Sequence, residues 1–146
     1  MSGFYEPPPA FSTPFRARLM SPKWELIASH LGRPVPPVLR ALYDAPEDIL
    51  RSHFKVFPPD DAPARWLDHF LPMDDEAIAP EGVRLPAGAV AFADDERGDP
   101  YVFVPDATPE GDGPVYLRPH RQGVDTLVPV APALSTFLAW ERRQSG

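Results

Sequence analysis

The chain has 146 residues, of which 22 are proline and none is cysteine, and it carries a net charge of −7. The missing cysteines exclude disulfide scaffolds, thiolate zinc sites and cysteine nucleophiles, and the negative charge disfavours a nucleic-acid partner and favours a basic one. Leucine, isoleucine, valine and phenylalanine supply 36 residues, about a quarter of the chain, which is enough to build a core. We therefore expect a folded domain with many proline-punctuated loops.

The N-terminal residues lack the features of a targeting or membrane segment. No basic region is followed by an apolar one, and the longest apolar run, residues 87–93, is far shorter than a membrane span. We expect a cytoplasmic protein that does not enter a membrane.

Residues 1–20 are expected to form an arm that precedes a single domain over residues 21–146. Pro7-Pro8-Pro9 favours polyproline II. The arm is nevertheless too apolar for a free linker, because it contains Phe4, Tyr5, Phe11 and Phe15. Two interpretations stay open: the aromatic side chains pack the arm onto the domain, or the arm docks on a partner.

Helices are predicted first in the domain. Ser21 as a cap and Pro22 at the first position start a helix that Gly32 ends. A second short helix is predicted over residues 38–43, with a continuation through residues 47–51.

The middle of the chain is less regular. Phe54–Phe57 reads as a short strand, and Pro58-Pro59 after it place the strand at an edge of a sheet. The apolar spacing of residues 64–71 fits a helical turn, with a strand as the alternative, and residues 74–79 are expected to form a further turn.

The second half alternates between strands and turns. A strand near Val90 and a return strand over residues 101–104 flank a turn at residues 95–99, which predicts a hairpin. Further strands are expected at Val115–Leu117 and over residues 124–130.

A closing helix is expected to run from Leu134 to Glu141, with Arg142 and Arg143 near its C-terminus. The predicted class is α+β: N-terminal helices, a central and mainly antiparallel sheet of about four to six strands, and a C-terminal helix.

The densest polar cluster lies in the predicted hairpin turn and contains Asp94, Asp95, Glu96 and Asp99. A calcium site is disfavoured because the spacing does not match a calcium loop. A pair of carboxylates for acid–base chemistry, an acidic loop that meets a basic partner, and a solvated turn all stay open. Asp74 and Asp75 read first as helix N-terminal acids and second as binding residues.

Motifs for catalysis are absent from the sequence. The four histidines, His30, His53, His69 and His120, form no His-Glu-x-x-His pattern, and there is neither a Gly-x-Ser-x-Gly motif nor a phosphate-binding loop. Residues 118–121 could hold an anion, although a solvated basic turn is the simpler interpretation. We expect no enzyme, no metal and no cofactor, with a small hydrolase that combines His53, His69 or His120 with carboxylates as an alternative.

The order of features over residues 36–140 resembles the SUKH superfamily, the cell-wall-assembly-regulator-like domains that include many bacterial immunity proteins. The resembling segments are Leu31-Gly32 with residues 36–43, Leu85-Pro86 with residues 91–95 and 98–103, residues 113–117, and residues 130–138. The chain departs from the family at Leu134, where phenylalanine is frequent, and in the proline- and tryptophan-rich residues 57–80.

The resemblance implies a non-catalytic domain that binds and neutralises a toxin, often a nuclease with a basic surface. The acidic charge of the chain agrees with such a partner. The predicted contact face comprises Asp94, Asp95, Glu96 and Asp99, with Asp74 and Asp75. Because the family also holds regulators and scaffolds, an adaptor without a toxin partner is the alternative. The oligomeric state is not predicted.

Overall fold

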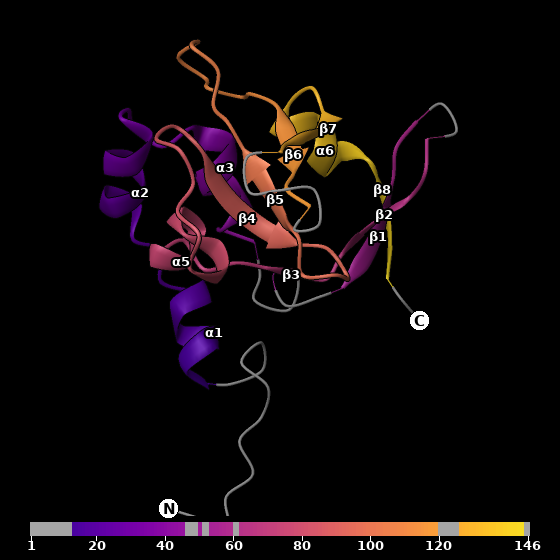
Figure 1. The fold of residues 1–146 in the computed structure, drawn as a ribbon, viewed down its shortest axis with the longest axis horizontal. Coiled ribbons are helices and arrows are strands. Elements are labelled where there is room, and N and C mark those ends of the chain that lie inside the picture. The colour runs from indigo at the N-terminus through magenta and orange to yellow at the C-terminus, as the bar shows by residue number, and fades with distance from the viewer. Residues whose placement is uncertain (1–12, 46–49, 51–52, 60–61, 120–125, 145–146) are drawn as a thin grey trace, which may run out of the picture.

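The computed structural model describes residues 13–45, 50, 53–59, 62–119 and 126–144 (Figure 1). It has the predicted α+β architecture, with helices before and after an antiparallel sheet. Within the described residues, no helix has the length and apolar character that a membrane crossing requires.

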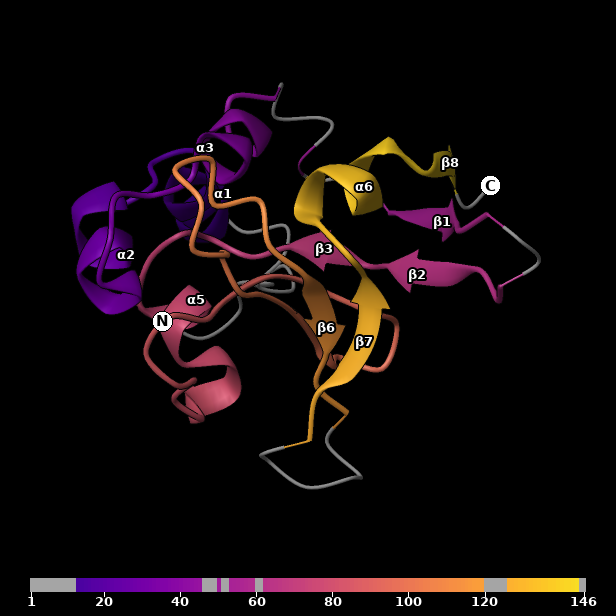
Figure 2. The same ribbon diagram turned by 90° about the horizontal axis from the view of Figure 1, so that it is seen from above.

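Among the described residues, eight strands form two antiparallel sheets. The larger sheet has the order β3-β4-β5-β6-β7 and the smaller one the order β2-β1-β8. The larger sheet consists of β3 (His69–Phe70), β4 (Val90–Asp94), β5 (Pro100–Phe103), β6 (Val115–Leu117) and β7 (Val128–Ala131). The smaller sheet consists of β1 (Phe54–Phe57), β2 (Arg65–Leu67) and β8 (Glu141–Gln144), and it extends from one end of the larger sheet (Figure 2).

The two sheets meet at Asp68, the single residue between β2 and β3. The backbone N–H of Asp68 donates to the carbonyl oxygen of Asp94 at 2.7 Å. The hydroxyl of Tyr101 on β5 donates to the carbonyl oxygen of Trp66 on β2 at 2.6 Å. These bonds hold the smaller sheet against the β4–β5 hairpin, and we call this region, residues 66–69 with the β4–β5 turn, the sheet junction.

The helices cover the main core. They are α1 (Thr13–Leu19), α2 (Trp24–Leu31), α3 (Pro37–Leu42), α5 (Asp75–Ile78), the 3-10 turn η2 (Pro80–Gly82) and α6 (Leu134–Ala139). Figures 1 and 2 show α2 and α5 at the opposite end of the molecule from the smaller sheet. Phe137 of α6 packs onto the larger sheet, with its ring centroid 5.3 Å from that of Tyr101 and 5.8 Å from that of Phe92. Such aromatic packing anchors α6 to the core.

The start of α2 differs from the prediction, whereas its end agrees. The helix begins at Trp24, and its cap is Lys23 rather than Ser21. Gly32 ends it with a φ of 72°, a left-handed conformation that glycine adopts without a steric penalty. Pro37 occupies the first turn of α3, as its fixed φ favours.

The prediction of an edge position for β1 was wrong, because β1 is the middle strand of the smaller sheet. Pro58 and Pro59 follow the strand, so every residue within β1 keeps the N–H that a middle strand needs. The second neighbour is β8, which forms where a helix was expected: α6 ends at Ala139, and Glu141–Gln144 pairs with β1.

Residues 64–71 adopt the alternative that the sequence left open. They form β2 and β3 and not a helical turn, because both segments pair with neighbouring strands. The predicted β4–β5 hairpin and the strand Val115–Leu117 are confirmed. The predicted helical continuation over residues 47–51 lies outside the described residues, apart from Leu50, which is buried. The start of the predicted strand, residues 124–125, also lies outside them.

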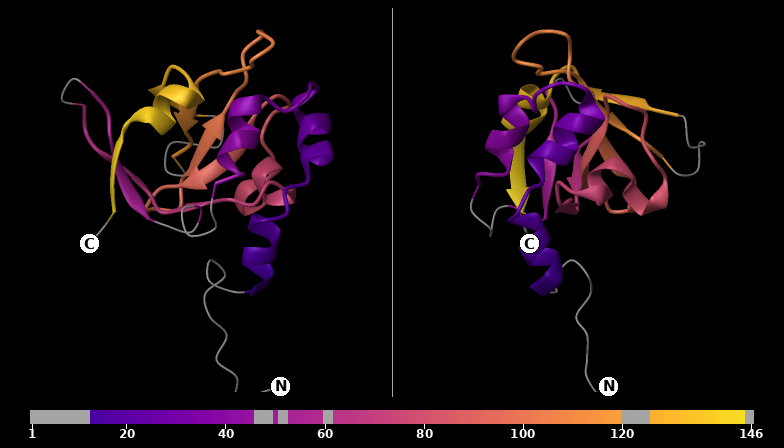
Figure 3. Two further views of the ribbon diagram at one scale, coloured as in Figure 1. Left: turned by 180° about the vertical axis from the view of Figure 1, so that it is seen from behind. Right: turned by 90° about the vertical axis from the view of Figure 1, so that its left-hand side faces the viewer.

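Regular structure begins before the predicted domain start at residue 21. The helix α1 projects from the body (Figure 3), and Leu19 at its end is fully buried in the main core. The division of the chain at residue 20 stays a prediction, and the polyproline segment and the aromatic side chains of residues 1–15 lie outside what the structure describes.

Candidate functional site

The β4–β5 turn is shaped by the carboxylate of Asp95. Its Oδ1 accepts hydrogen bonds from the backbone N–H groups of Arg97 and Asp99, both at 2.9 Å. The backbone N–H of Asp95 donates to the carbonyl oxygen of Asp99 at 2.9 Å, and Gly98 has a φ of 80°. Asp95 and Asp99 are both buried. These two predicted contact residues therefore build the turn from within.

Burial raises the pKa of the Asp95 carboxyl, while the backbone hydrogen bonds from Asp99 and Arg97 oppose this shift and the charges of Asp99 and Glu96 add to it. Folding thus disfavours the ionised form of this side chain. The carboxylate that accepts both backbone hydrogen bonds of the turn is therefore also one whose pKa the fold raises.

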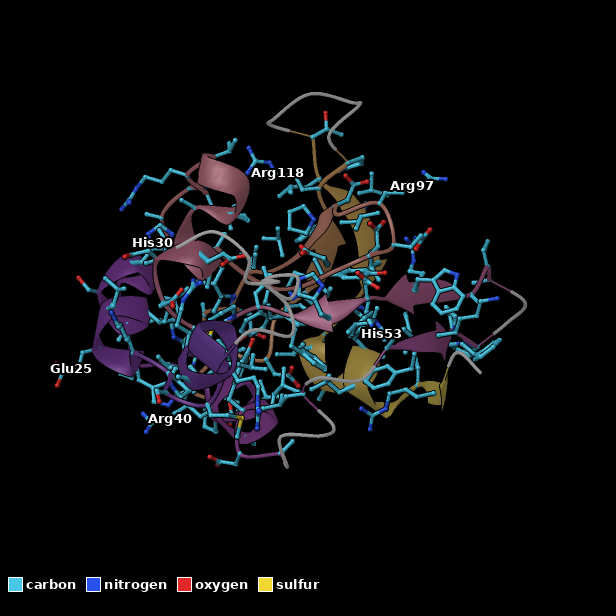
Figure 4. The ribbon with its side chains drawn as sticks, turned by 90° about the horizontal axis from the view of Figure 1, so that it is seen from below. Glu25, His30, Arg40, His53, Arg97 and Arg118 are labelled. Carbon is cyan, nitrogen blue, oxygen red and sulfur yellow. The ribbon has the colours of Figure 1, made fainter. Side chains whose placement is uncertain are left out.

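Glu96 is the exposed acidic residue at the tip of the turn, and Arg97 beside it is also exposed. Figure 4 shows the side chain of Arg97 pointing away from the body. Charged groups at such a position lose little solvation before contact and can steer an approaching partner.

A chain of alternating imidazole and carboxylate groups lies at the sheet junction. Nδ1 of His53 lies 3.0 Å from Oδ1 of Asp68, and Nδ1 of His69 lies 3.4 Å from Oδ2 of the same carboxylate. Nε2 of His69 lies 3.2 Å from Oδ2 of Asp94. His53, which Figure 4 labels beside the smaller sheet, precedes β1, so this chain of side chains joins three segments of the protein.

Exposure differs along this chain. The side chain of Asp68 is 46% exposed and that of Asp94 only 14%. Asp68 therefore presents a carboxylate to solvent near the β4–β5 hairpin, whereas Asp94 is mostly enclosed. The described residues contain no group of three or more histidine, aspartate or glutamate side chains that could hold a metal ion.

Asp74 has a structural position at the other predicted acidic site. It caps α5 by accepting the backbone N–H of Glu76 at 3.0 Å. Its carboxylate also receives two hydrogen bonds from Arg18 of α1, at 2.8 and 3.1 Å. Asp74 is buried and Asp75 is exposed. The structure confirms that Asp74 and Asp75 lie at the N-terminus of a helix. It also shows that Asp74 links α5 to α1 through Arg18.

The pKa of Asp74 is lowered. Burial works to raise it, but the hydrogen bonds from Arg18 and from the Glu76 backbone, together with the charges of Arg18 and Lys23, outweigh the burial. The ionised form is therefore the one that the fold stabilises, in contrast to Asp95.

Of the six predicted contact residues, the structure brings four together on the β4–β5 hairpin and places Asp74 and Asp75 on α5. Sequence reasoning joined His53 and His69 to carboxylates only in the hydrolase alternative, without naming the carboxylates. It missed Asp68 and the proximity of His69 to Asp94. The usable signal was the strand alternative for residues 64–71, because a strand there pairs with β4 and sets His69 opposite Asp94.

The fold places this polar junction in a small α+β domain. Residues 24–140 match the SMI1/KNR4 family (SUKH-1), and the chain belongs to this family. Domains of this family are protein-interaction modules and are generally not enzymes. No curated protein and no solved structure matches the chain at a significant level.

Proposed function

We propose that the chain is a non-catalytic protein-binding domain of the immunity type, which neutralises a basic toxin domain by covering its active surface. The observation that supports this function most is the sheet junction, where exposed carboxylates stand on a frame built from both sheets. Membership of the SUKH-1 family and the net charge of −7 agree with it.

The rigidity of the junction favours binding. Asp95 fixes the turn that carries Glu96, and the pairing of β2 with β1 and of β3 with β4 fixes the position of Asp68 between the sheets. A contact surface that is ordered before association loses less conformational entropy on binding. The junction can therefore present negative charge in a defined arrangement.

We assign different roles to the six predicted contact residues. Glu96, which is exposed, and Asp94, whose side chain is 14% exposed, are proposed to face the partner at the sheet junction. The exposed Asp75 lies on α5, away from the junction, and is left out of this contact. The other three, which are buried, hold the elements that carry them; these are Asp74, Asp95 and Asp99. We add Asp68 to the proposed contact residues because its carboxylate is exposed.

Charge reversal tests the proposal. The partner is the toxin-like domain encoded beside this chain or recovered with it from its own cells, and binding is measured by calorimetry and by association kinetics at several salt concentrations. Glu96→Lys and Asp68→Lys should each slow association by about tenfold and flatten its salt dependence, because opposite charges at a contact rim mainly steer the encounter.

Glu25→Lys provides the matched control, since Glu25 is also exposed but lies on α2. It changes the net charge equally and should alter association far less. Equal effects of all three substitutions would indicate a general charge effect, and unchanged binding of Glu96→Lys and Asp68→Lys would place the contact surface elsewhere.

The adaptor function is a second candidate, and the helix α1 favours it. Arg16, Ala17 and Arg18 are exposed, and Met20 is 38% exposed beyond the helix. Because Leu19 is buried in the core, the informative deletion removes residues 1–12 and leaves α1 in place. An adaptor that recruits its partner through residues 1–12 would lose binding, whereas a domain that binds through α1 or through the sheet junction would keep it.

A further inference from the structure

A pocket of about 370 Å³ lies on the face of the larger sheet that α6 does not cover. Tyr101 and Phe103 of β5 point into the main core, and Val102 between them points to the opposite face because side chains alternate along a strand. Val102, Leu85 and Ala89 are buried and form the floor of the pocket. The remaining lining residues are Arg84, Pro86, Arg118 and Leu127.

The wall over residues 84–89 is held in place by His30 of α2. Because a carbonyl oxygen can only accept, the Nε2–H of His30 donates to the carbonyl oxygens of Pro86 and Ala89, at 3.1 and 3.0 Å. The N–H of Gly88 donates to the carbonyl oxygen of His30 at 3.2 Å. The pocket is therefore formed before any ligand arrives, which is typical of binding sites.

The charge of the pocket is opposite to that of the chain. Two of the described residues that line it are arginines and none is acidic, although the whole chain carries a net charge of −7. Arg84 is exposed, and Arg118 is only 8% exposed. Guanidinium groups above an apolar floor suit a carboxylate carried on an apolar body.

The surroundings of the pocket favour a polypeptide as the source of that carboxylate. Among the described residues, the exposed large hydrophobic side chains are Met20, Val83 and Leu127. Leu127 lies on the rim, and Val83 precedes Arg84 in the chain. Exposed apolar groups beside arginines are characteristic of protein contact surfaces.

We propose that this pocket binds an acidic, apolar segment of a protein partner, with an apolar side chain on Val102 and a neighbouring carboxylate against Arg84 and Arg118. The pocket would bind an acidic group, whereas the sheet junction is proposed to bind a basic surface. The two proposals are therefore independent of each other. The sequence of residues 118–121 is compatible with an anion site, and in this proposal Arg118 would contact the anion. His120 and Arg121 lie outside the described residues.

A peptide titration of the full, isotope-labelled chain tests the proposal by nuclear magnetic resonance. The probe is the acetylated and amidated peptide Glu-Leu-Phe-Glu. We expect saturable shifts at Leu85, Ala89 and Val102, and Arg84→Gln should weaken binding about three- to tenfold, because hydrogen bonds to charged groups are among the stronger ones. Leu127→Ser provides a second exposed variant that should also weaken binding.

The controls separate charge, apolar contact and ligand source. Arg40→Gln removes an exposed arginine on α3, outside both the pocket and the sheet junction, and should leave the affinity unchanged. The peptides Lys-Leu-Phe-Lys and Glu-Ser-Ser-Glu should not bind. Equal binding of the lysine peptide, equal binding to the Arg84→Gln variant, or saturable binding of hexanoate without binding of the acidic peptide would each overturn the proposal.

Discussion

Replacement of Asp95 separates its role as a hydrogen-bond acceptor from its role as a charge. Asp95→Ala removes the acceptor of two backbone N–H groups, those of Arg97 and Asp99. Each N–H left without a partner in a buried place costs on the order of 1–3 kcal/mol. Because Asp95 is only 7% exposed, little water replaces the lost acceptor, and we expect a loss of about 2–4 kcal/mol in the free energy of unfolding.

Asp95→Asn keeps an oxygen in the same place and removes the charge. The pKa of Asp95 is raised above its ordinary value of 3.8, so folding favours the protonated form. Ionised Asp95 therefore lowers the free energy of unfolding of the parent protein. This destabilisation is absent below pH 3.8 and fully present above the folded-state pKa. The asparagine variant should therefore lie within about 1 kcal/mol of the parent protein, and its stability relative to the parent should improve as the pH rises from 3 to 7.

Urea unfolding measures both variants, with the fluorescence of the three tryptophans as the signal. The decisive quantity is the difference in the free energy of unfolding between Asp95→Ala and Asp95→Asn. If Asp95→Asn destabilises the protein as much as Asp95→Ala does, the charge and not the acceptor holds the turn. If neither variant loses stability, the turn does not depend on Asp95.

Three further substitutions and one control substitution, Asp75→Asn, test the frame around the candidate surfaces. Asp74→Ala should cost about 1–3 kcal/mol, because α5 loses its cap and Arg18 loses a partner, while Asp75→Asn, at an exposed position, should change stability by less than about 0.5 kcal/mol. Since the pKa of Asp74 is lowered, its contribution is present above pH 3.8 and is lost as the pH falls through the folded-state value, so the Asp74→Ala loss should shrink in acid urea titrations. Gly98→Ala should cost about 1 kcal/mol in urea unfolding, because its φ of 80° strains a side chain; an unchanged midpoint would contradict the turn geometry. Phe137→Ala should cost about 3–5 kcal/mol in the same assay, because the ring is fully buried against the larger sheet; a loss below about 1 kcal/mol would show that α6 packs loosely.

Local sequence signals predicted the second half of the fold well. The β4–β5 hairpin followed from alternation and from a turn that contains Gly98, and the end of α2 followed from Gly32. Signals that depend on distant pairing failed. Residues 141–144 become β8 only because β1, more than eighty residues earlier, offers a free edge, and no local pattern reports such a partner.

The same distinction applies to the candidate site. The acidic turn at residues 95–99 was visible in the sequence, but the burial of Asp95 and Asp99 was not, since it depends on how the turn folds back on its own backbone. The proximity of Asp68 to Asp94 required the register of β3 against β4. Sequence reasoning could therefore find the acidic segment without finding which of its carboxylates reach solvent.

The most direct test of the central claim is carboxyl footprinting of the chain alone and bound to its partner. A carbodiimide and an amine label exposed carboxylates, and mass spectrometry measures the labelling of each residue. Binding through the sheet junction predicts that labelling of Glu96 and Asp68 falls several-fold in the complex, while labelling of Glu25 on α2 stays constant. Unchanged labelling of Glu96 and Asp68, with protection confined to Glu25 or other distant carboxylates, would contradict the claim.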